Sequence, residues 1–150
     1  LGQGHAALNR EPTDLVALAR EAVAGTPVRL EIADGLPQLS LDPARTRLLL
    51  GNLVDNAVRH GGKEQRPVLH LEPAAAGIAL VMRDFGPGVA DDALPHLAEP
   101  FYRADAARQR ATGGVGPGPD PCPLVAQAHG GMLEVRNARP GLEVRVTLAG

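Results

Sequence analysis

The stretch DPARTRLLLGNLVDNAVRHGG, residues 42–62, carries the strongest helix signal in the chain. Asp42 can cap a helix N-terminus, and Pro43 suits the first helical position because the N–H that proline lacks would have no helical partner there. Apolar residues then recur at helical spacing until Gly61 and Gly62. Since glycine favours a helix end, we predict one long helix between these signals.

The segments before this helix predict a shorter helix and two strands. EPTDLVALAREAV, residues 11–23, places apolar residues at helical spacing, with Thr13 or Asp14 as the cap. VRLEI (28–32) alternates apolar and charged residues, and QLSL (38–41) is a short second run of strand character. We expect the short helix to pack on the surface of the domain.

Strands are prominent after the long helix. Two runs separated by AAA predict adjacent antiparallel strands, and two alternating runs around the turn signal RPG predict a terminal hairpin. Between these pairs we expect a short helix, a mobile glycine-rich loop and a last helix of about two turns. The first pair of strands is 67–73 and 77–84, and the strands of the hairpin are 132–139 and 141–150. Between them, the short helix is 90–101, the loop 103–118 and the last helix 123–129. The pattern predicts an α+β two-layer sandwich, with a mixed, mostly antiparallel sheet of about five strands on about three helices.

Composition excludes several classes of protein. The 150 residues are 44% apolar, which suits one domain, and two Phe, one Tyr and no Trp cannot supply a base-stacking platform. A formal charge of −2 gives no broad surface for nucleic acid or an anionic membrane. The single cysteine excludes a disulfide framework. No apolar run approaches the roughly 20 residues of a membrane span. We therefore expect a cytoplasmic fragment that contacts neither nucleic acid nor membrane.

Polar side chains form a stripe on the predicted long helix. Asn52, Asn56, Arg59 and His60 stand at i, i+4, i+7 and i+8 and therefore share one face. Carboxamide oxygens can serve a hydrated Mg²⁺, and a guanidinium can bind phosphate through paired donors. A solvated polar face is the alternative interpretation of the same stripe.

Two glycine-containing motifs could approach a ligand closely. RDFGPGVADD places Asp84 at a strand end, before Gly86 and Gly88, where a carboxylate could accept a hydrogen bond from the exocyclic amine of adenine. GGVGPG (113–118) could direct backbone N–H groups at phosphate oxygens. Alone, the first motif is equally typical of a tight turn and the second of a flexible linker. EPFYR (99–103) lies between them.

The order of these motifs resembles the ATP-binding catalytic domain of sensor histidine kinases. That domain belongs to the ATPase superfamily of gyrase, a class of heat-shock chaperones and MutL, whose fold is the Bergerat type. The resemblance extends from about Thr13 to Leu148 and includes NLVDNAVRH, DFGPG, EPFYR and the AHGG ending. It implies a cofactor pair of ATP and Mg²⁺, with Asn56 as the metal ligand and Asp84 as the reader of adenine.

The resemblance also implies the remaining site residues. It implies that Asn52 and Arg59 are the catalytic residues. Asn52 stands where the hydrolytic relatives have a water-activating Glu. Transfer to another protein is then favoured over hydrolysis. The cofactor-binding set that the resemblance implies is Asn52, Asn56, Arg59, His60, Asp84, Gly86, Gly88, Phe101, Arg103, Gly114, Gly116 and Gly118.

The same resemblance implies the partners and the domain organisation. We expect the γ-phosphate of ATP to be transferred to a histidine on a dimerisation domain outside this chain, and then to a response regulator. Residues 1–12 would end the preceding dimerisation segment, and residues 13–150 would form the ATP-binding catalytic domain. His5 lacks the sequence context of a phosphoacceptor. The parent kinase could be anchored in a membrane.

The chain departs from the family pattern in two places. Phe85 replaces the usual Asn, which the site can tolerate because Asp84 and the glycines carry the contacts. Pro117, Pro119 and Pro121 replace helical leucines, and each proline inside a helix costs about 3 kcal/mol. We expect 117–122 to be extended, with a helix beginning at Pro123 and a displaced lid.

These prolines leave a second function open. The chain could be a catalytically impaired kinase or an interaction module, with the same fold and weak or no nucleotide binding. A serine-directed anti-sigma kinase of the same superfamily is a third alternative, but EPFYR and AHGG argue against it.

Overall fold

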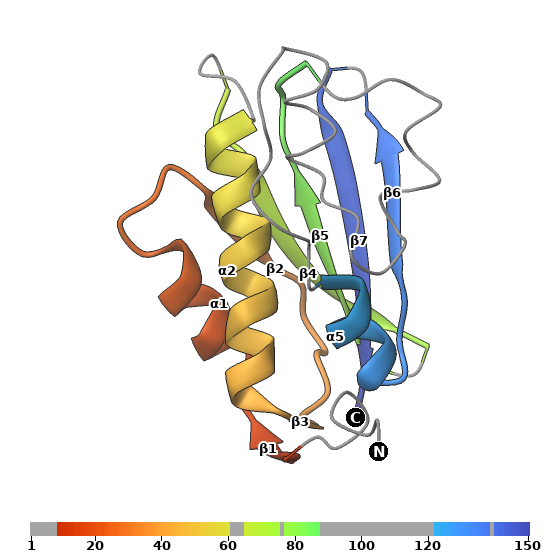
Figure 1. The fold of residues 1–150 in the computed structure, drawn as a ribbon. Helices are drawn as coiled ribbons and strands as arrows, with labels where there is room; N and C mark the ends of the chain where they lie inside the picture. The colour runs from red at the N-terminus through yellow and green to blue at the C-terminus, as the bar shows by residue number, and fades with distance from the viewer. Residues whose placement is uncertain (1–8, 61–64, 76, 88–121, 139) are drawn as a thin grey trace.

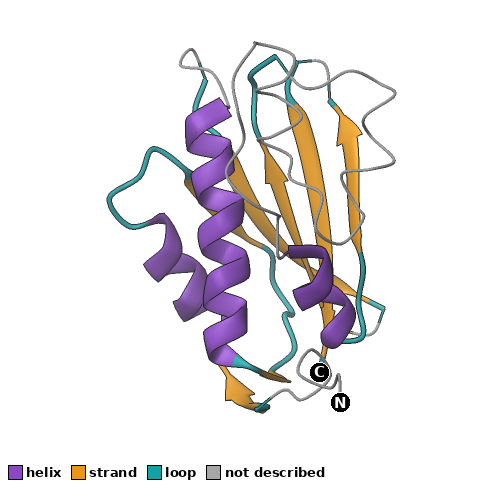
Figure 2. Ribbon diagram, viewed as in Figure 1, coloured by secondary structure: helices purple, strands orange, loops and turns teal. Residues whose placement is uncertain are grey.

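The computed structural model describes residues 9–60, 65–75, 77–87, 122–138 and 140–150. In this part of the chain a β-sheet forms one layer and the helices lie against one of its faces (Figures 1 and 2). The sheet has five strands, and a separate two-stranded pair lies at its lower end in Figure 1. This arrangement confirms the predicted α+β two-layer sandwich.

The strand order of the main sheet is β2-β4-β5-β7-β6. The first pair, β2 with β4, is parallel, and the other three pairs are antiparallel. The sheet is therefore mixed and mostly antiparallel, with β5 in the centre. The strands are β1 (Glu11–Thr13), β2 (Arg29–Ile32), β3 (Leu39–Leu41), β4 (Val68–Ala74), β5 (Gly77–Arg83), β6 (Leu133–Asn137) and β7 (Leu142–Ala149), and β1 pairs with β3.

The described residues contain three helices, and aspartates cap the first two. In α1 (Leu15–Val23) the Asp14 carboxylate accepts a hydrogen bond from the N–H of Ala17 at 3.0 Å. In α2 (Pro43–His60) the carboxylate of Asp42 accepts from the N–H of Arg45 at 3.1 Å. These bonds satisfy N–H groups that have no partner within the helix. The third helix is α5 (Cys122–Ala128).

The core lies between α2 and the sheet. One face of α2 and the alternate residues of β5 are buried together. Burying a large apolar side chain in this way stabilises the fold by about 1.5–3 kcal/mol. The opposite face of the sheet carries charges paired across strands, such as Arg145 with Glu72 at 2.8 Å and Arg136 with Glu143 at 2.8 Å. The buried set on α2 and β5 is Leu49, Leu50, Leu53, Val54, Ala57, Ile78, Leu80 and Met82.

A buried histidine connects the lower ends of three elements. The Nε2 of His129 accepts a hydrogen bond from the backbone N–H of Asp42 at 3.1 Å, and its Nδ1 lies 2.9 Å from the carbonyl oxygen of Val125. Because Nε2 accepts, the neutral ring must carry its proton on Nδ1 and donate to Val125. The carbonyl of His129 also accepts from the N–H of Ala149 at 3.0 Å. One residue thus ties α5 to the start of α2 and the end of β7.

Both titratable groups of this junction have lowered pKa values. Burial lowers the pKa of His129 from its usual 6.5, although the hydrogen bond with Val125 opposes the change. Burial alone would raise the pKa of Asp42, but the N–H groups of Arg45 and Asn9 and the Arg45 guanidinium hold it below its usual 3.8. The folded chain therefore binds these two protons less readily than the unfolded chain.

Acid should destabilise the fold through this junction. As the pH falls through 6.5, the unfolded chain takes up the His129 proton before the folded chain does, so the free energy of unfolding decreases. Asp42 adds a second decrease in the free energy of unfolding as the pH falls below 3.8. We expect denaturant titrations at a series of pH values to show the free energy of unfolding begin to fall at about pH 7.5 and to keep falling below pH 6.5.

The variant His129→Gln should weaken this dependence because glutamine does not titrate. It should also lower stability at neutral pH by about 1–3 kcal/mol, since a fully buried hydrogen bond is disturbed. If the free energy of unfolding depends on pH with the same slope in the variant and in the unchanged chain, His129 is not the source of this dependence.

Most predicted elements are confirmed within a residue or two. The strand β1 was not predicted, and α5 begins at Cys122, one residue before the expected Pro123. The helix expected over 90–101, the loop 103–118 and the extended segment at 117–121 lie outside the described residues. Asn9 and Arg10 hydrogen-bond to Asp42, Ser40 and Ala149, while the division between 1–12 and 13–150 stays a prediction.

Candidate functional site

The candidate site lies where α2 and β5 both end. The two elements run in the same direction, and their C-terminal ends lie at the upper end of the molecule in Figure 1. The two elements are in contact. The second half of α2, which carries the polar stripe, and the aspartate after β5 therefore lie toward the same end of the fold.

Asp84 is the best-defined residue of this site. It follows the last residue of β5 and is only 3% exposed. Its Oδ1 accepts hydrogen bonds from the N–H of Gly86 at 3.2 Å and from the N–H of Leu142 at 3.1 Å. Its own N–H donates to the carbonyl oxygen of Leu142 at 2.9 Å. A buried carboxylate held by backbone donors is a fixed acceptor, since rotation would break both bonds.

The turn between β6 and β7 packs directly against Asp84. Gly141 adopts a φ of +83°, and a Cβ at this position would lie 2.1 Å from the carbonyl oxygen of Asp84. Arg83 reaches the same turn, where its guanidinium donates to the carbonyl oxygen of Pro140 at 3.0 Å and lies 4.4 Å from the ring centre of Phe85. The turn, the arginine and the aspartate thus form one packed cluster.

The polar stripe on α2 has its own local hydrogen bonds. The amide nitrogen of Asn52 donates to the carbonyl oxygen of Leu48 at 2.8 Å, one turn earlier in the helix. Arg59 pairs with Asp55 at 3.2 Å across one helical turn. Asn52 and Asn56 are half-buried and Arg59 is exposed. Exposed pairs of this kind contribute about 0.3–0.5 kcal/mol, so a ligand could displace them at little cost.

The described residues include only part of the predicted site. Asn52, Asn56, Arg59, Asp84 and Gly86 are placed, together with the backbone of His60 at the end of α2. The remaining predicted residues lie outside the described part of the chain. They are Gly88, Phe101, Arg103, Gly114, Gly116 and Gly118.

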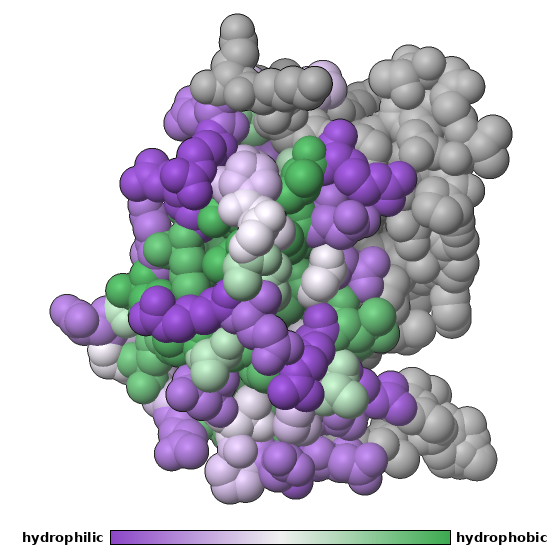
Figure 3. Space-filling view, turned by 90° about the vertical axis from the view of Figure 1, so that its left-hand side faces the viewer, coloured by the Kyte–Doolittle hydropathy of each residue, from purple (hydrophilic) through white to green (hydrophobic). Residues whose placement is uncertain are grey.

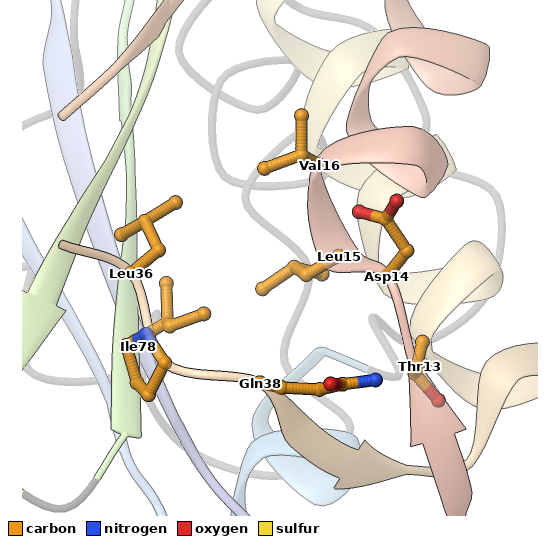
Figure 4. A pocket seen from close by; sticks show the side chains of 8 residues that line it. Thr13, Asp14, Leu15, Val16, Leu36, Gln38 and Ile78 are labelled. Carbon is orange, nitrogen blue, oxygen red and sulfur yellow. The ribbon is translucent and has the colours of Figure 1, made fainter. Parts of the chain in front are cut away.

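A cavity of about 300 Å³ lies at the other end of the sheet (Figure 4). Leu15, Leu36 and Ile78 supply apolar parts of its lining, and Thr13 and Gln38 supply polar parts. The Asp14 carboxylate, which also lines the cavity, is already engaged in capping α1. Ile78 and Asp84 are six residues apart on an extended strand, which corresponds to roughly 20 Å. The cavity is therefore separate from the candidate site.

Comparison with known proteins identifies the family. A family model described as histidine kinase-, DNA gyrase B-, and HSP90-like ATPase matches residues 41–149. The chain belongs to this family. The signal transduction histidine-protein kinase AfsQ2 of Streptomyces coelicolor is 40% identical over 101 residues, which cover 67% of the chain. The matched part is only 18% of AfsQ2, so the chain corresponds to one portion of such a kinase.

Solved structures of sensor kinases have the same fold. The histidine kinase domain of the E. coli osmosensor EnvZ has a TM-score of 0.69 and 26% identity, covering 93% of the chain and 89% of that domain. Full-length ShkA in complex with AMPPNP has a TM-score of 0.74 and 24% identity, covering 99% of the chain and 33% of ShkA. The predicted relationship to sensor-kinase ATPase domains is confirmed.

On the side that carries α1, Figure 3 shows apolar patches interrupted by hydrophilic side chains. Among the described helices, none combines the length and apolar character needed to cross a membrane.

Sequence reasoning missed Arg83, Gly141 and Leu142 as neighbours of Asp84. The signal RPG indicates a turn at 139–141, and the structure confirms a hairpin there. Nothing in the spacing of the residues, however, connects that turn with an aspartate 57 or 58 positions earlier. The link depends on β7 pairing with β5, which places Glu143 opposite Arg83.

The role of Asn52 can be tested without unfolding the domain. Asn52→Ala removes a solvent-exposed hydrogen bond of a half-buried side chain and introduces a stronger helix former, so thermal denaturation should give a stability within about 0.5 kcal/mol of the unchanged chain. A loss of several kcal/mol would instead assign a structural role to this side chain.

Proposed function

We propose that this chain is the ATP-binding catalytic domain of a two-component sensor histidine kinase. It binds ATP with Mg²⁺ and presents the γ-phosphate to a histidine on a dimerisation domain outside this chain, from which a response regulator receives it. The observation that carries the proposal is the buried Asp84 carboxylate, held by two backbone N–H groups at the end of the fold where α2 also ends. Family membership and the AMPPNP complex of ShkA support it.

Asp84 suits recognition of adenine by its chemistry. A carboxylate accepts hydrogen bonds but donates none, so it complements the donor that adenine carries at its exocyclic amine. Guanine and hypoxanthine present an oxygen acceptor at that position, which would face the carboxylate unfavourably. A buried polar group left facing the wrong partner is costly, and this cost gives a base-selective pocket.

The α2 stripe suits a magnesium ion held mainly by phosphate. Among the described residues, no group of three or more His, Cys, Asp or Glu side chains could hold a metal ion. Mg²⁺ commonly takes one or two protein oxygens and completes its octahedral shell with water and substrate phosphates. The amide oxygen of Asn56 would supply the protein ligand, and bound Mg²⁺ would neutralise phosphate charge during transfer. Arg59 and Asn52 would contact the phosphates.

The absence of a carboxylate at position 52 favours transfer over hydrolysis. Asn52 is an amide, and its nitrogen donates to the Leu48 carbonyl oxygen. An amide cannot accept a proton from attacking water as a general base would. We therefore propose that this chain positions the nucleotide and stabilises charge, while the acceptor histidine supplies the nucleophile.

The proline-rich segment supports one alternative, an interaction module with weak or no nucleotide binding. Pro117, Pro119 and Pro121 precede α5, which has only seven residues and begins at Cys122. Prolines at these positions prevent the helix from extending toward the phosphate-binding glycines. Such a chain would keep the kinase fold and act through protein contacts.

Asp84→Asn should weaken binding of a non-hydrolysable ATP analogue by tenfold or more. Asparagine can keep accepting from Gly86 and Leu142 through its oxygen, but its NH₂ group would then face the amine of adenine, donor against donor. Calorimetric titration measures the change. Asp34→Asn on the exposed β2–β3 connection is the matched control and should bind like the unchanged chain. Equal affinities for all three proteins would contradict the proposed pocket.

The two functions can be separated with a lid variant. Pro117→Leu, Pro119→Leu and Pro121→Leu together should restore the helical pattern of the family. If the unchanged chain binds the ATP analogue at micromolar concentration in a magnesium-dependent manner, the kinase proposal is supported. Binding by the leucine variant alone would favour the interaction module.

A further inference from the structure

We propose that the β6–β7 turn sets the orientation of the Asp84 carboxylate, with Gly141 and Arg83 as positioning residues for base selectivity. The inference deepens the proposed function and rests on it. The turn would act without touching the nucleotide, by fixing the acceptor that reads the base. Its parts come from two separate segments, one at the end of β5 and one at the start of β7.

The first argument is the direct contact between the turn and the carboxylate. The N–H of Leu142 donates to Oδ1 of Asp84 at 3.1 Å, and the N–H of Gly86 donates to the same atom at 3.2 Å. Two donors from different segments converge on one oxygen and therefore define the plane of the carboxylate. Hydrogen bonds weaken steeply as their angle departs from linearity, so a small rotation would misalign the acceptor.

The second argument is the lack of space at Gly141. A Cβ there would lie 2.1 Å from the carbonyl oxygen of Asp84 and 2.6 Å from its Oδ1. The φ of +83° is also one that residues with side chains rarely adopt. Any side chain at 141 must therefore move either the turn or the carboxylate, and Leu142 N–H would move with the turn.

The third argument is the bracing of the turn by Arg83. Its guanidinium donates to the carbonyl oxygen of Pro140 at 3.0 Å and, more weakly, to that of Ala138 at 3.4 Å. Its Nε donates to the carbonyl oxygen of Asp84 at 3.1 Å. The same group lies 4.4 Å from the ring centre of Phe85, within the range of a cation–π interaction. Arg83 thus connects both sides of the cluster.

The test compares two glycine variants of the full 150-residue chain. Gly141→Ala introduces both backbone strain and the clash with Asp84, whereas Gly35→Ala introduces strain at a φ of +79° with no atom within 4 Å of the new Cβ. Each variant is titrated with a non-hydrolysable ATP analogue and with the corresponding inosine nucleotide, which carries oxygen in place of the exocyclic amine.

We expect Gly141→Ala to lose at least tenfold in affinity for the ATP analogue and to lose most of its preference over the inosine nucleotide. Gly35→Ala should keep its affinity for the ATP analogue and its preference for adenine within twofold of those of the unchanged chain. This should hold even where its melting temperature falls as far as that of Gly141→Ala. A Gly141→Ala protein with the same preference for adenine as Gly35→Ala would overturn the inference.

Arg83→Met provides a second variant should Gly141→Ala fail to fold. It keeps the apolar stem of the side chain but removes the donors to the turn, and we expect a smaller loss of base preference in the same direction. Unchanged preference in Arg83→Met would overturn the role of Arg83.

Amide hydrogen exchange of nucleotide-free protein gives a readout independent of ligand binding. Exchange at Leu142 should accelerate in Gly141→Ala and in Arg83→Met but not in Gly35→Ala. Unchanged exchange at Leu142 would overturn this inference and leave the proposed function unaffected. An unchanged chain that binds neither nucleotide would instead contradict the proposed function, so the two failures are distinguishable.

Discussion

The hydrogen bond from the backbone N–H of Asp42 to Nε2 of His129 is the contact on which the arrangement of the helices depends. It joins the start of α2 to the end of α5, and the adjacent carbonyl of His129 binds the end of β7. The buried ring accepts and donates with no unsatisfied nitrogen, so the junction tolerates burial. Because α2 is anchored at this end, its direction across the sheet is set, and its C-terminal half is carried to the opposite end.

Stability and binding are therefore divided between the two ends of α2. The lower end contains buried, fully bonded polar groups, whereas the upper end carries half-buried amides and a surface ion pair of little energetic value. Asp84 is the exception, a buried carboxylate whose orientation is fixed by backbone donors from two segments. The proposed nucleotide site would combine one rigid acceptor for a base with exchangeable groups for phosphate and metal, which suits a nucleotide that must bind and leave.

Local signals in the sequence predicted most of the fold. Asp42 and Pro43 marked the start of α2, runs of strand character marked β4 and β5, and alternation marked β6 and β7, because capping and side-chain period depend on neighbouring residues. The strand β1 was missed because three residues, one of them proline, give no measurable alternation. The motifs singled out Asn52, Asn56 and Asp84 as candidate site residues. They did not predict the contact of Gly141 with Asp84, because that contact depends on how β5 and β7 pair across more than 50 residues.

Backbone amide shifts of the ¹⁵N-labelled chain, followed by NMR during titration with an ATP analogue and Mg²⁺, test the central claim most directly. The account places the ligand between the end of β5 and the second half of α2. It predicts saturable shifts at Asp84, Gly86 and Leu142 and along 52–59, with none at the cavity lined by Leu15 and Leu36. Shifts confined to that cavity, or no saturable shift at Asp84, would contradict it.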